Sequence, residues 1–318
     1  MPAEAQSAPR VRLVTVDDSA EGQRVDNFLL KHLKGAPRTL IYRLLRKGEV
    51  RVNKGRVKPT YKLNIGDQVR IPPVRLAEPG EPVIVSDNQQ ASILKTIIYE
   101  DDLMIIVNKP SGWAVHGGSG VSLGVIEALR AARPELTQLE LAHRLDRDTS
   151  GCLMLAKRRS ALKSLQELQR RGAIKKCYLA LLAGRWRKGQ ATVDMPLRKN
   201  TLAGGERVVR IDPEGKPSRT FYKVLDRYNE ATLTEVTLDT GRTHQIRVHS
   251  AYLGTPILGD PKYGDAEANR AFRELGLRRL FLHAHSLAFT WPDTGERFDI
   301  SAPLPDELQA VLDKLGRD

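Results

Sequence analysis

The chain has 318 residues, of which 41% are hydrophobic and 28% are charged, a composition typical of a folded globular protein of more than one domain. No run approaches 18 consecutive apolar residues, so no membrane span is expected. The polar N-terminus lacks the apolar core of a secretory signal. Cys152 and Cys177 are the only cysteines, which argues against a disulfide scaffold and predicts a cytoplasmic location.

Positive charge is concentrated near the N-terminus. The formal net charge is +13, and residues 24–72 contain thirteen Lys or Arg against three acidic residues. A solvated basic surface of purely structural origin would spread its charge more evenly along the chain. The local excess therefore predicts a polyanionic partner, and we expect nucleic acid.

Residues 21–73 carry the pattern of a small basic domain, preceded by a tail at 1–20 that we expect to be disordered. Apolar residues repeat at helical spacing from Val25 to Leu33. A second helix ends at Gly48 and presents a basic outer face. This face consists of Arg38, Arg43, Arg46 and Lys47. Strand signals follow, and the whole order resembles the S4 RNA-binding domain. The resemblance implies that the basic helix contacts the RNA backbone without selecting sequence.

Residues 74–92 are rich first in proline and then in polar residues, which is typical of a linker. The larger domain is predicted over residues 93–318. Strand patterns outnumber helical ones, and they do not alternate regularly with helices. We therefore predict an α+β protein whose larger domain is a mixed, mainly antiparallel sheet with flanking helices. Two of these helices are expected at 125–132 and 245–252.

A charged segment at residues 143–151, His-Arg-Leu-Asp-Arg-Asp-Thr-Ser-Gly, lies between two apolar, strand-like runs. Loops held by rigid strands often present catalytic groups. Asp146 is two residues from Arg144 and adjacent to Arg147, and a neighbouring cation keeps a carboxylate ionised. Such an aspartate can act as a nucleophile or a base. The residues alone indicate no more than this.

Other chemistries fit less well. The His-Arg pair resembles a kinase catalytic loop, but no glycine loop or Asp-Phe-Gly accompanies it. The glycines at 117–120 lack the Gly-Lys-Ser/Thr of a phosphate loop. No Gly-x-Ser-x-Gly elbow is present, and the histidines lack the spacing of a zinc site. We therefore expect no bound metal and no nucleotide cofactor.

The segment from His143 to Gly151 resembles the signature of the RluA-type ribosomal large subunit pseudouridine synthases. Three further motifs agree in the family's order: residues 99–110, the Tyr-Leu-Ala-Leu run at 178–181, and Gly-Arg-Thr-His-Gln-Ile-Arg at 241–247. The resemblance implies an isomerase that converts uridine to pseudouridine without a cofactor. It also implies that the partner is 23S rRNA or a large-subunit assembly intermediate, with no membrane and no obligate protein partner, so we expect a monomer.

The resemblance also implies roles for five residues. Asp146 corresponds to the essential carboxylate, and Arg242 to the arginine that pairs with it. Tyr178 corresponds to the tyrosine that stacks on the base and helps to remove the C5 proton. Arg144 corresponds to the arginine that fills the gap left by an extruded base. Leu282 is expected to form a wall of the pocket.

Several alternatives stay open at this point. Asp146 can attack C1′ or remove the 2′ proton, and related members of the family modify other uridines of the same rRNA. A glycosidase would use a pair of carboxylates, for which Asp148 is the second candidate. A third alternative is a non-catalytic RNA-binding or ribosome-assembly factor, in which Asp146 has no chemical role.

Overall fold

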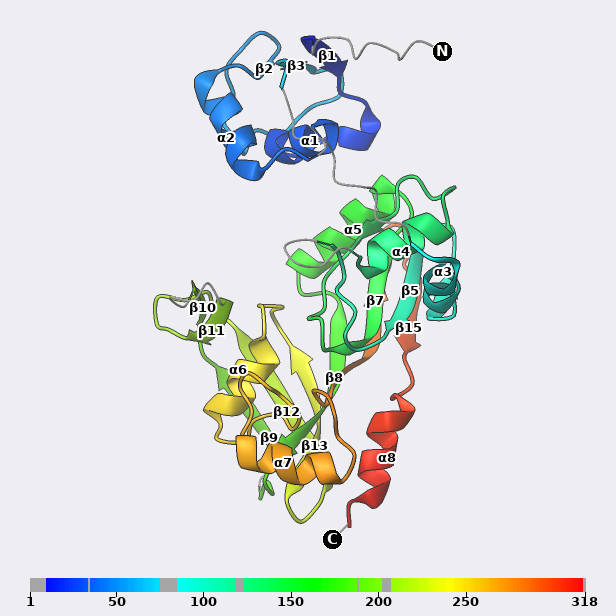
Figure 1. Ribbon diagram of the computed structural model, residues 1–318, viewed down its shortest axis with the longest axis vertical. Coiled ribbons are helices and arrows are strands. Elements are labelled where there is room, and N and C mark those ends of the chain that lie inside the picture. The colour runs from blue at the N-terminus through cyan, green and yellow to red at the C-terminus, as the bar shows by residue number, and fades with distance from the viewer. Residues whose placement is uncertain are drawn as a thin grey trace, which may run out of the picture. The chain divides into compact units, whose positions relative to one another are not determined.

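The computed structural model describes residues 10–33, 35–74, 85–117, 123–187, 189–201 and 207–316. The chain divides into two compact units, Met1–Ile84 and Val85–Asp318 (Figure 1). Both units combine helices with antiparallel strands, so the α+β class is confirmed. No helix in the described part of the chain is long and apolar enough to cross a membrane.

The first unit packs two helices against a small sheet. The helices are α1 (Val25–His32) and α2 (Arg38–Lys47), and a 3-10 turn at Asp18–Ala20 precedes them. The sheet has the order β1-β3-β2, with β1 at Arg12–Thr15, β2 at Arg51–Val52 and β3 at Gln68–Ile71. Apolar residues of both helices are buried in one core with Val69 and Ile71, which leaves the charged face of α2 in solvent.

Gly48 ends α2 in the left-handed conformation with φ +71°, as its position in the sequence predicts. A Cβ there would also collide with the side chain of Arg56. The expectation of a disordered tail over residues 1–20 is wrong from β1 onward. Backbone pairing with β3 and the burial of Val16 hold this segment in place, although Leu13 is 70% exposed.

The linker predicted over residues 74–92 is wrong for its polar second half. Residues 75–84 lie outside the described residues. The polar part that follows forms helix α3 (Asp87–Leu94). Ser86 begins this helix with a capping box, because its hydroxyl accepts from the Gln89 amide while the Gln89 side chain accepts from the Ser86 amide. Polar residues that favour a linker by composition therefore serve as a helix start.

The second unit is built on a ten-stranded sheet with the order β4-β5-β7-β14-β8-β13-β12-β9, to which β6 and β15 add at β7 and β14. Among the strands that the structure describes, only β7 and β14 pair in parallel. The strands are β4 (Ile97–Glu100), β5 (Met104–Lys109), β6 (Glu140–Leu141), β7 (Ser150–Ala156), β8 (Lys175–Ala183), β9 (Gln190–Asp194), β12 (Arg219–Arg227), β13 (Ala231–Leu238), β14 (Leu282–Thr290) and β15 (Arg297–Ser301). A separate hairpin joins β10 (Leu197–Thr201) to β11 (Arg207–Ile211). The predicted mixed, mainly antiparallel sheet is confirmed.

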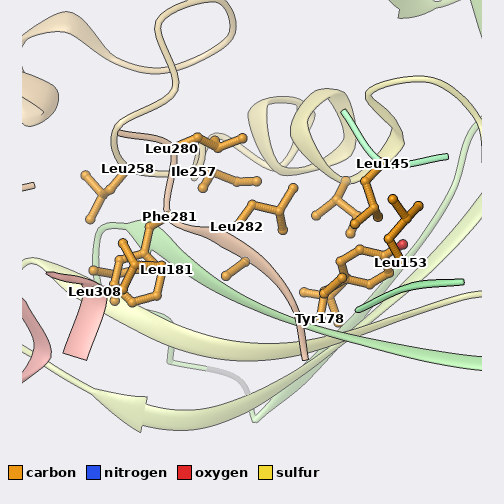
Figure 2. Packing of buried hydrophobic residues seen from close by; sticks show 14 of the residues in the cluster. Leu145, Leu153, Tyr178, Leu181, Ile257, Leu258, Leu280, Phe281, Leu282 and Leu308 are labelled. Carbon is orange, nitrogen blue, oxygen red and sulfur yellow. The ribbon is translucent and has the colours of Figure 1, made fainter. Parts of the chain in front are cut away.

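Helices cover both faces of this sheet, because alternate residues of the central strands point to opposite sides. In β7, Leu153 and Leu155 join the core beneath α3, α4 and α8, while Cys152 and Met154 join the core beneath α5. Figure 2 shows part of the first core, in which Tyr178 lies beside Leu153. The helices are α4 (Val125–Ala132), α5 (Arg159–Arg170), α6 (Gln245–Tyr252), α7 (Ala266–Glu274) and α8 (Asp306–Lys314). Both helices expected in this domain have the predicted bounds.

Candidate active site

The charged segment forms a loop folded tightly against the start of β7. The Ala142 amide donates to the Met154 carbonyl, and the Met154 amide donates to Nε2 of His143, 3.0 Å away. Leu145 is only 5% exposed and points into the core. With that side chain as an anchor, the next residue, Asp146, faces a pocket with 18% of its side chain exposed.

This pocket, which we term the Asp146 pocket, brings together residues from four separate parts of the sequence. The loop at residues 143–151, which we call the catalytic loop because it carries the predicted catalytic residue, contributes Asp146 and Arg144. Strand β8 contributes Tyr178, β14 contributes Leu282, and the turn from β13 into α6 contributes Arg242. All five residues that the sequence assigned to the reaction or the pocket therefore line it. The other four predicted RNA contacts, Arg38, Arg43, Arg46 and Lys47, are exposed on α2 of the first unit.

The predicted pairing of Arg242 with Asp146 is wrong. The guanidinium of Arg242 donates from Nε to the carbonyl of Pro217, 3.2 Å away. Arg247, five residues later, lies with Nη1 3.9 Å from Oδ2 of Asp146. Arg247 belongs to the same sequence motif. It is buried on α6, whereas Arg242 is exposed in the turn before the helix. The motif in the sequence does not show which of the two arginines meets Asp146. In the structure, Arg247 lies on the buried face of α6, and Arg242 does not.

A second carboxylate holds Arg247 in place. Nε and Nη2 of Arg247 each lie 2.7 Å from an oxygen of Asp260, whose side chain is fully buried. The Asp260 carboxylate also accepts from the amides of Lys262 and Tyr263. Burial raises the pKa of Asp260, but the hydrogen bonds and charge of Arg247 together with the amides of Lys262 and Tyr263 outweigh it, and the net shift is downward. The guanidinium thus reaches Asp146 with its remaining nitrogen while its other edge is fixed.

His244 lies on the other side of Asp146, with Nε2 3.9 Å from Oδ2. It adopts a left-handed backbone with φ +54°, which is rare for a residue with a side chain. Its Nδ1 is 2.8 Å from the hydroxyl of Tyr263, and that oxygen accepts from the Val209 amide. A neutral imidazole donates from one ring nitrogen and accepts at the other, so neutral His244 donates either to Tyr263 or toward Asp146. Burial lowers the pKa of His244, which favours this neutral form.

Tyr178 is 8% exposed in the centre of the sheet, between strands β13 and β14. Figure 2 shows its ring at the same end of the core as Leu145. Burial, together with the negative charge of Asp146, raises the pKa of the Tyr178 hydroxyl. The phenol is therefore protonated in the free protein, with its ring available as a wall for a planar ligand.

A buried lysine secures the far end of the catalytic loop. Nζ of Lys109 donates to the carbonyls of Pro110, Trp113 and Arg147 at 2.8–2.9 Å. Burial lowers the pKa of Lys109 to about 7, against the attraction of Asp148. The loop ends at Gly151, whose φ is +108° and where any Cβ would overlap the Ala284 carbonyl of β14. This glycine allows β14 to approach the loop.

The carboxylate pair required by a glycosidase is not assembled here. Asp148 lines a different cavity, together with Arg273, Arg278 and Arg279. The Asp146 pocket has no other aspartate or glutamate among its described lining residues. Within the described ranges, no group of three His, Cys, Asp or Glu side chains is arranged to hold a metal ion.

Comparison with known proteins identifies the family. The sequence profile of RNA pseudouridylate synthases matches residues 103–252, and that of the S4 domain matches residues 23–69. A ribosomal large subunit pseudouridine synthase C from Escherichia coli K12 is 56% identical over 310 residues, covering 96% of this chain and 97% of its own. The chain belongs to the RNA pseudouridylate synthases. A second relative of the same name, from Haemophilus influenzae, is 54% identical over 96% of this chain and 95% of its own.

The resemblance to the RluA-type ribosomal large subunit enzymes is thus confirmed, and with it the class of isomerase. Within that family, the sequence Val-His-Gly-Gly-Ser-Gly at residues 115–120 and the S4-like unit favour the C-type members, and both relatives carry that name. The fold agrees as well. The human RNA pseudouridylate synthase domain containing 4 superimposes with a TM-score of 0.59 at 28% identity, covering 71% of this chain and 96% of its own.

Proposed function

We propose that the protein isomerises specific uridines of 23S rRNA to pseudouridine, with Asp146 as the essential residue. The observation that carries this is the position of Asp146 in a pocket shared with Tyr178 and Arg247. The substrate is 23S rRNA or an assembly intermediate of the large subunit, by analogy with the two relatives. The C-type specificity that their names indicate is preferred over that of other members of the family.

The reaction breaks the N1–C1′ bond of uridine and forms a C5–C1′ bond, while a proton leaves C5 and N1 gains one. No atom enters or leaves overall, so the net reaction consumes no second substrate. A carboxylate beside a fixed guanidinium is suited to attack C1′ or to remove the 2′ proton. Arg247 orients Asp146 for either step, and Nε2 of His244 lies 3.9 Å from the same carboxylate oxygen.

The uridine must leave its stack to reach a pocket of this kind, and an enzyme that flips a base offsets the lost stacking with its own contacts. Arg144 is exposed on the catalytic loop at the pocket, a suitable position to occupy the vacated space. The ring of Tyr178 and the side chain of Leu282 provide walls for the flipped uracil. The exposed α2 face of the first unit supplies sequence-independent backbone contacts.

The test uses 23S rRNA fragments tritiated at uridine C5. The wild-type protein should release tritium and return nucleosides of unchanged mass, and Asp146→Asn should abolish release while RNA binding changes less than about threefold. Asp148→Asn is the matched control, because this carboxylate lines another cavity, and it should retain release. Free uracil would identify a glycosidase instead. Full tritium release by Asp146→Asn would refute Asp146 as the essential residue, and no release by the wild-type protein would leave only a role in binding RNA or in ribosome assembly.

A further inference from the structure

A second cavity continues from the Asp146 pocket. It has a volume of about 390 Å³ and is bounded by the β10–β11 hairpin, the turn that precedes β12, and residues 241–243. Those three residues also line the Asp146 pocket. Sites for small ligands typically measure about 300–1,000 Å³, so one nucleotide fits in this volume. We call this cavity the hairpin groove.

The rim of the hairpin groove is cationic. Lys199, Lys216 and Arg242 line it and are exposed. The groove contains one acidic side chain among its described lining residues, Glu214, and Nη1 of Arg198 lies 2.9 Å from it. The charges of Arg198 and Glu214 cancel each other. The positive charges of the other three lining cations therefore remain at the groove.

Hydrogen bonds to neighbouring backbone groups fix the main chain of Lys216 and the guanidinium of Arg242. The amide and carbonyl of Lys216 each bond to Leu197 of β10, at 2.8 and 2.9 Å. The next residue, Pro217, accepts the bond from Nε of Arg242, which leaves both terminal nitrogens of that guanidinium without a partner among the described residues. The backbone of Lys216 and the guanidinium of Arg242 are thus positioned next to each other before any ligand binds.

The floor of the groove is apolar and packs against α6, the helix that carries Arg247. Leu197 and Val209 are buried against Val248 of α6. The Val209 amide also donates to Tyr263, whose hydroxyl contacts His244. Positive groups above an apolar floor are suited to a nucleotide, whose phosphate is anionic and whose sugar and base offer apolar surface.

We propose that the hairpin groove is a subsite for a nucleotide flanking the modified uridine on the same strand, with its phosphate held between Arg242 and Lys216. The inference rests on the proposed function, since it requires an RNA strand that enters the Asp146 pocket. A guanidinium with two free nitrogens matches two phosphate oxygens, and the lysine adds a point charge. Arg242 is therefore a substrate-binding residue rather than the partner of Asp146.

The first experiment separates binding from turnover. Arg242→Ala and Lys216→Ala should each raise the KM for a 23S rRNA fragment about tenfold with kcat within twofold of wild type. Lys223→Ala is the matched control, since it removes an exposed cation of β12 that does not line the groove, and its KM should stay within twofold. A loss of kcat in Arg242→Ala at unchanged KM would overturn the proposal, as would Lys216→Ala behaving like Lys223→Ala.

A second experiment identifies the phosphate and does not depend on turnover. Fragments carrying one neutral methylphosphonate at a time are bound to the inactive Asp146→Asn protein. One linkage near the target uridine should weaken binding about tenfold, and adding Arg242→Ala should remove that sensitivity. Equal sensitivity with and without Arg242→Ala would refute the subsite. If the wild-type protein released no tritium, the proposed function would fail. The binding measurement would still show whether Arg242 contacts a phosphate of the RNA.

Discussion

Arg247 bonds to Asp260 through two nitrogens, each 2.7 Å from a carboxylate oxygen, while its third nitrogen lies 3.9 Å from Asp146. The guanidinium therefore links a buried carboxylate to the one in the pocket. Asp260 takes no part in the pocket itself, since it is not among the residues that line it. In the proposed reaction, Asp260 is therefore expected to act only through the orientation of Arg247.

We predict that Asp260→Asn lowers kcat by at least tenfold and destabilises the protein by about 3 kcal/mol, because the buried guanidinium loses its partner charge. Tritium release and urea unfolding measure the two effects. Trp113, Trp186 and Trp291 are the only tryptophans and all lie in the second unit, so their fluorescence reports its unfolding. Asp239→Asn, at the exposed end of a 3.8 Å pair, should change neither quantity appreciably. Wild-type kcat in Asp260→Asn would contradict the positioning role.

Tyr178→Phe tests the hydroxyl separately from the ring. The ring still forms the pocket wall, so we expect RNA affinity to stay within about threefold of wild type. The family's proton-transfer role predicts a loss of tritium release of about 100-fold or more. Tyr178→Ala should in addition weaken binding. Normal release by the phenylalanine variant would confine this residue to stacking.

Lys109→Met tests the support beneath the catalytic loop. Methionine fills similar space but gives no hydrogen bond to the carbonyls of Pro110, Trp113 and Arg147, which lie around Nζ. Three unpaired acceptors should loosen the loop, and we expect kcat to fall at least tenfold while the far-UV circular dichroism is unchanged. Exchange of the Arg147 and Asp148 amides with deuterium should accelerate. If kcat and exchange both matched wild type, the lysine would have no positioning function.

Replacing Arg43, Arg46 and Lys47 with alanine tests the basic face of α2. Each contact with a duplex phosphate contributes about 0.9 to the slope of log affinity against log salt concentration. We therefore expect weaker binding and a slope reduced by about two to three, measured by fluorescence anisotropy from 50 to 200 mM salt. An unchanged slope would show that this face does not contact the RNA backbone.

Burial of His283 is expected to make the free energy of unfolding depend on pH. It is fully buried, and burial lowers its pKa to about 4. Between pH 6.5 and 4 the unfolded chain therefore binds more protons at this site than the folded one, so stability falls as the pH falls. The loss from this group reaches about 3 kcal/mol at pH 4. Urea titrations across this range should show the decline, and His283→Gln should flatten it; an equal slope in both would assign the decline to other groups.

Local patterns predicted much of this protein. Gly48 indicated the end of α2, and the apolar spacing gave α4 and α6 with their observed bounds. The residues gathered at Asp146 were mostly foreseen through the family resemblance. Strand β1 and the buried partnership of Arg247 with Asp260 were not. The pairing of Arg247 with Asp260 depends on a contact distant in sequence and leaves no signal in the residues around it. The run Val11-Arg12-Leu13-Val14-Thr15-Val16, in contrast, is typical of a strand, and the prediction of a disordered tail did not use it.

The order of strands in the second unit has a consequence for biosynthesis. β14 lies between β7, which carries the loop of Asp146, and β8, which carries Tyr178. These two strands cannot reach their final spacing until residues 282–290 have left the ribosome that makes them. A nascent chain therefore remains unable to modify RNA until nearly all of it has been translated, and premature termination before β14 yields no partly active enzyme.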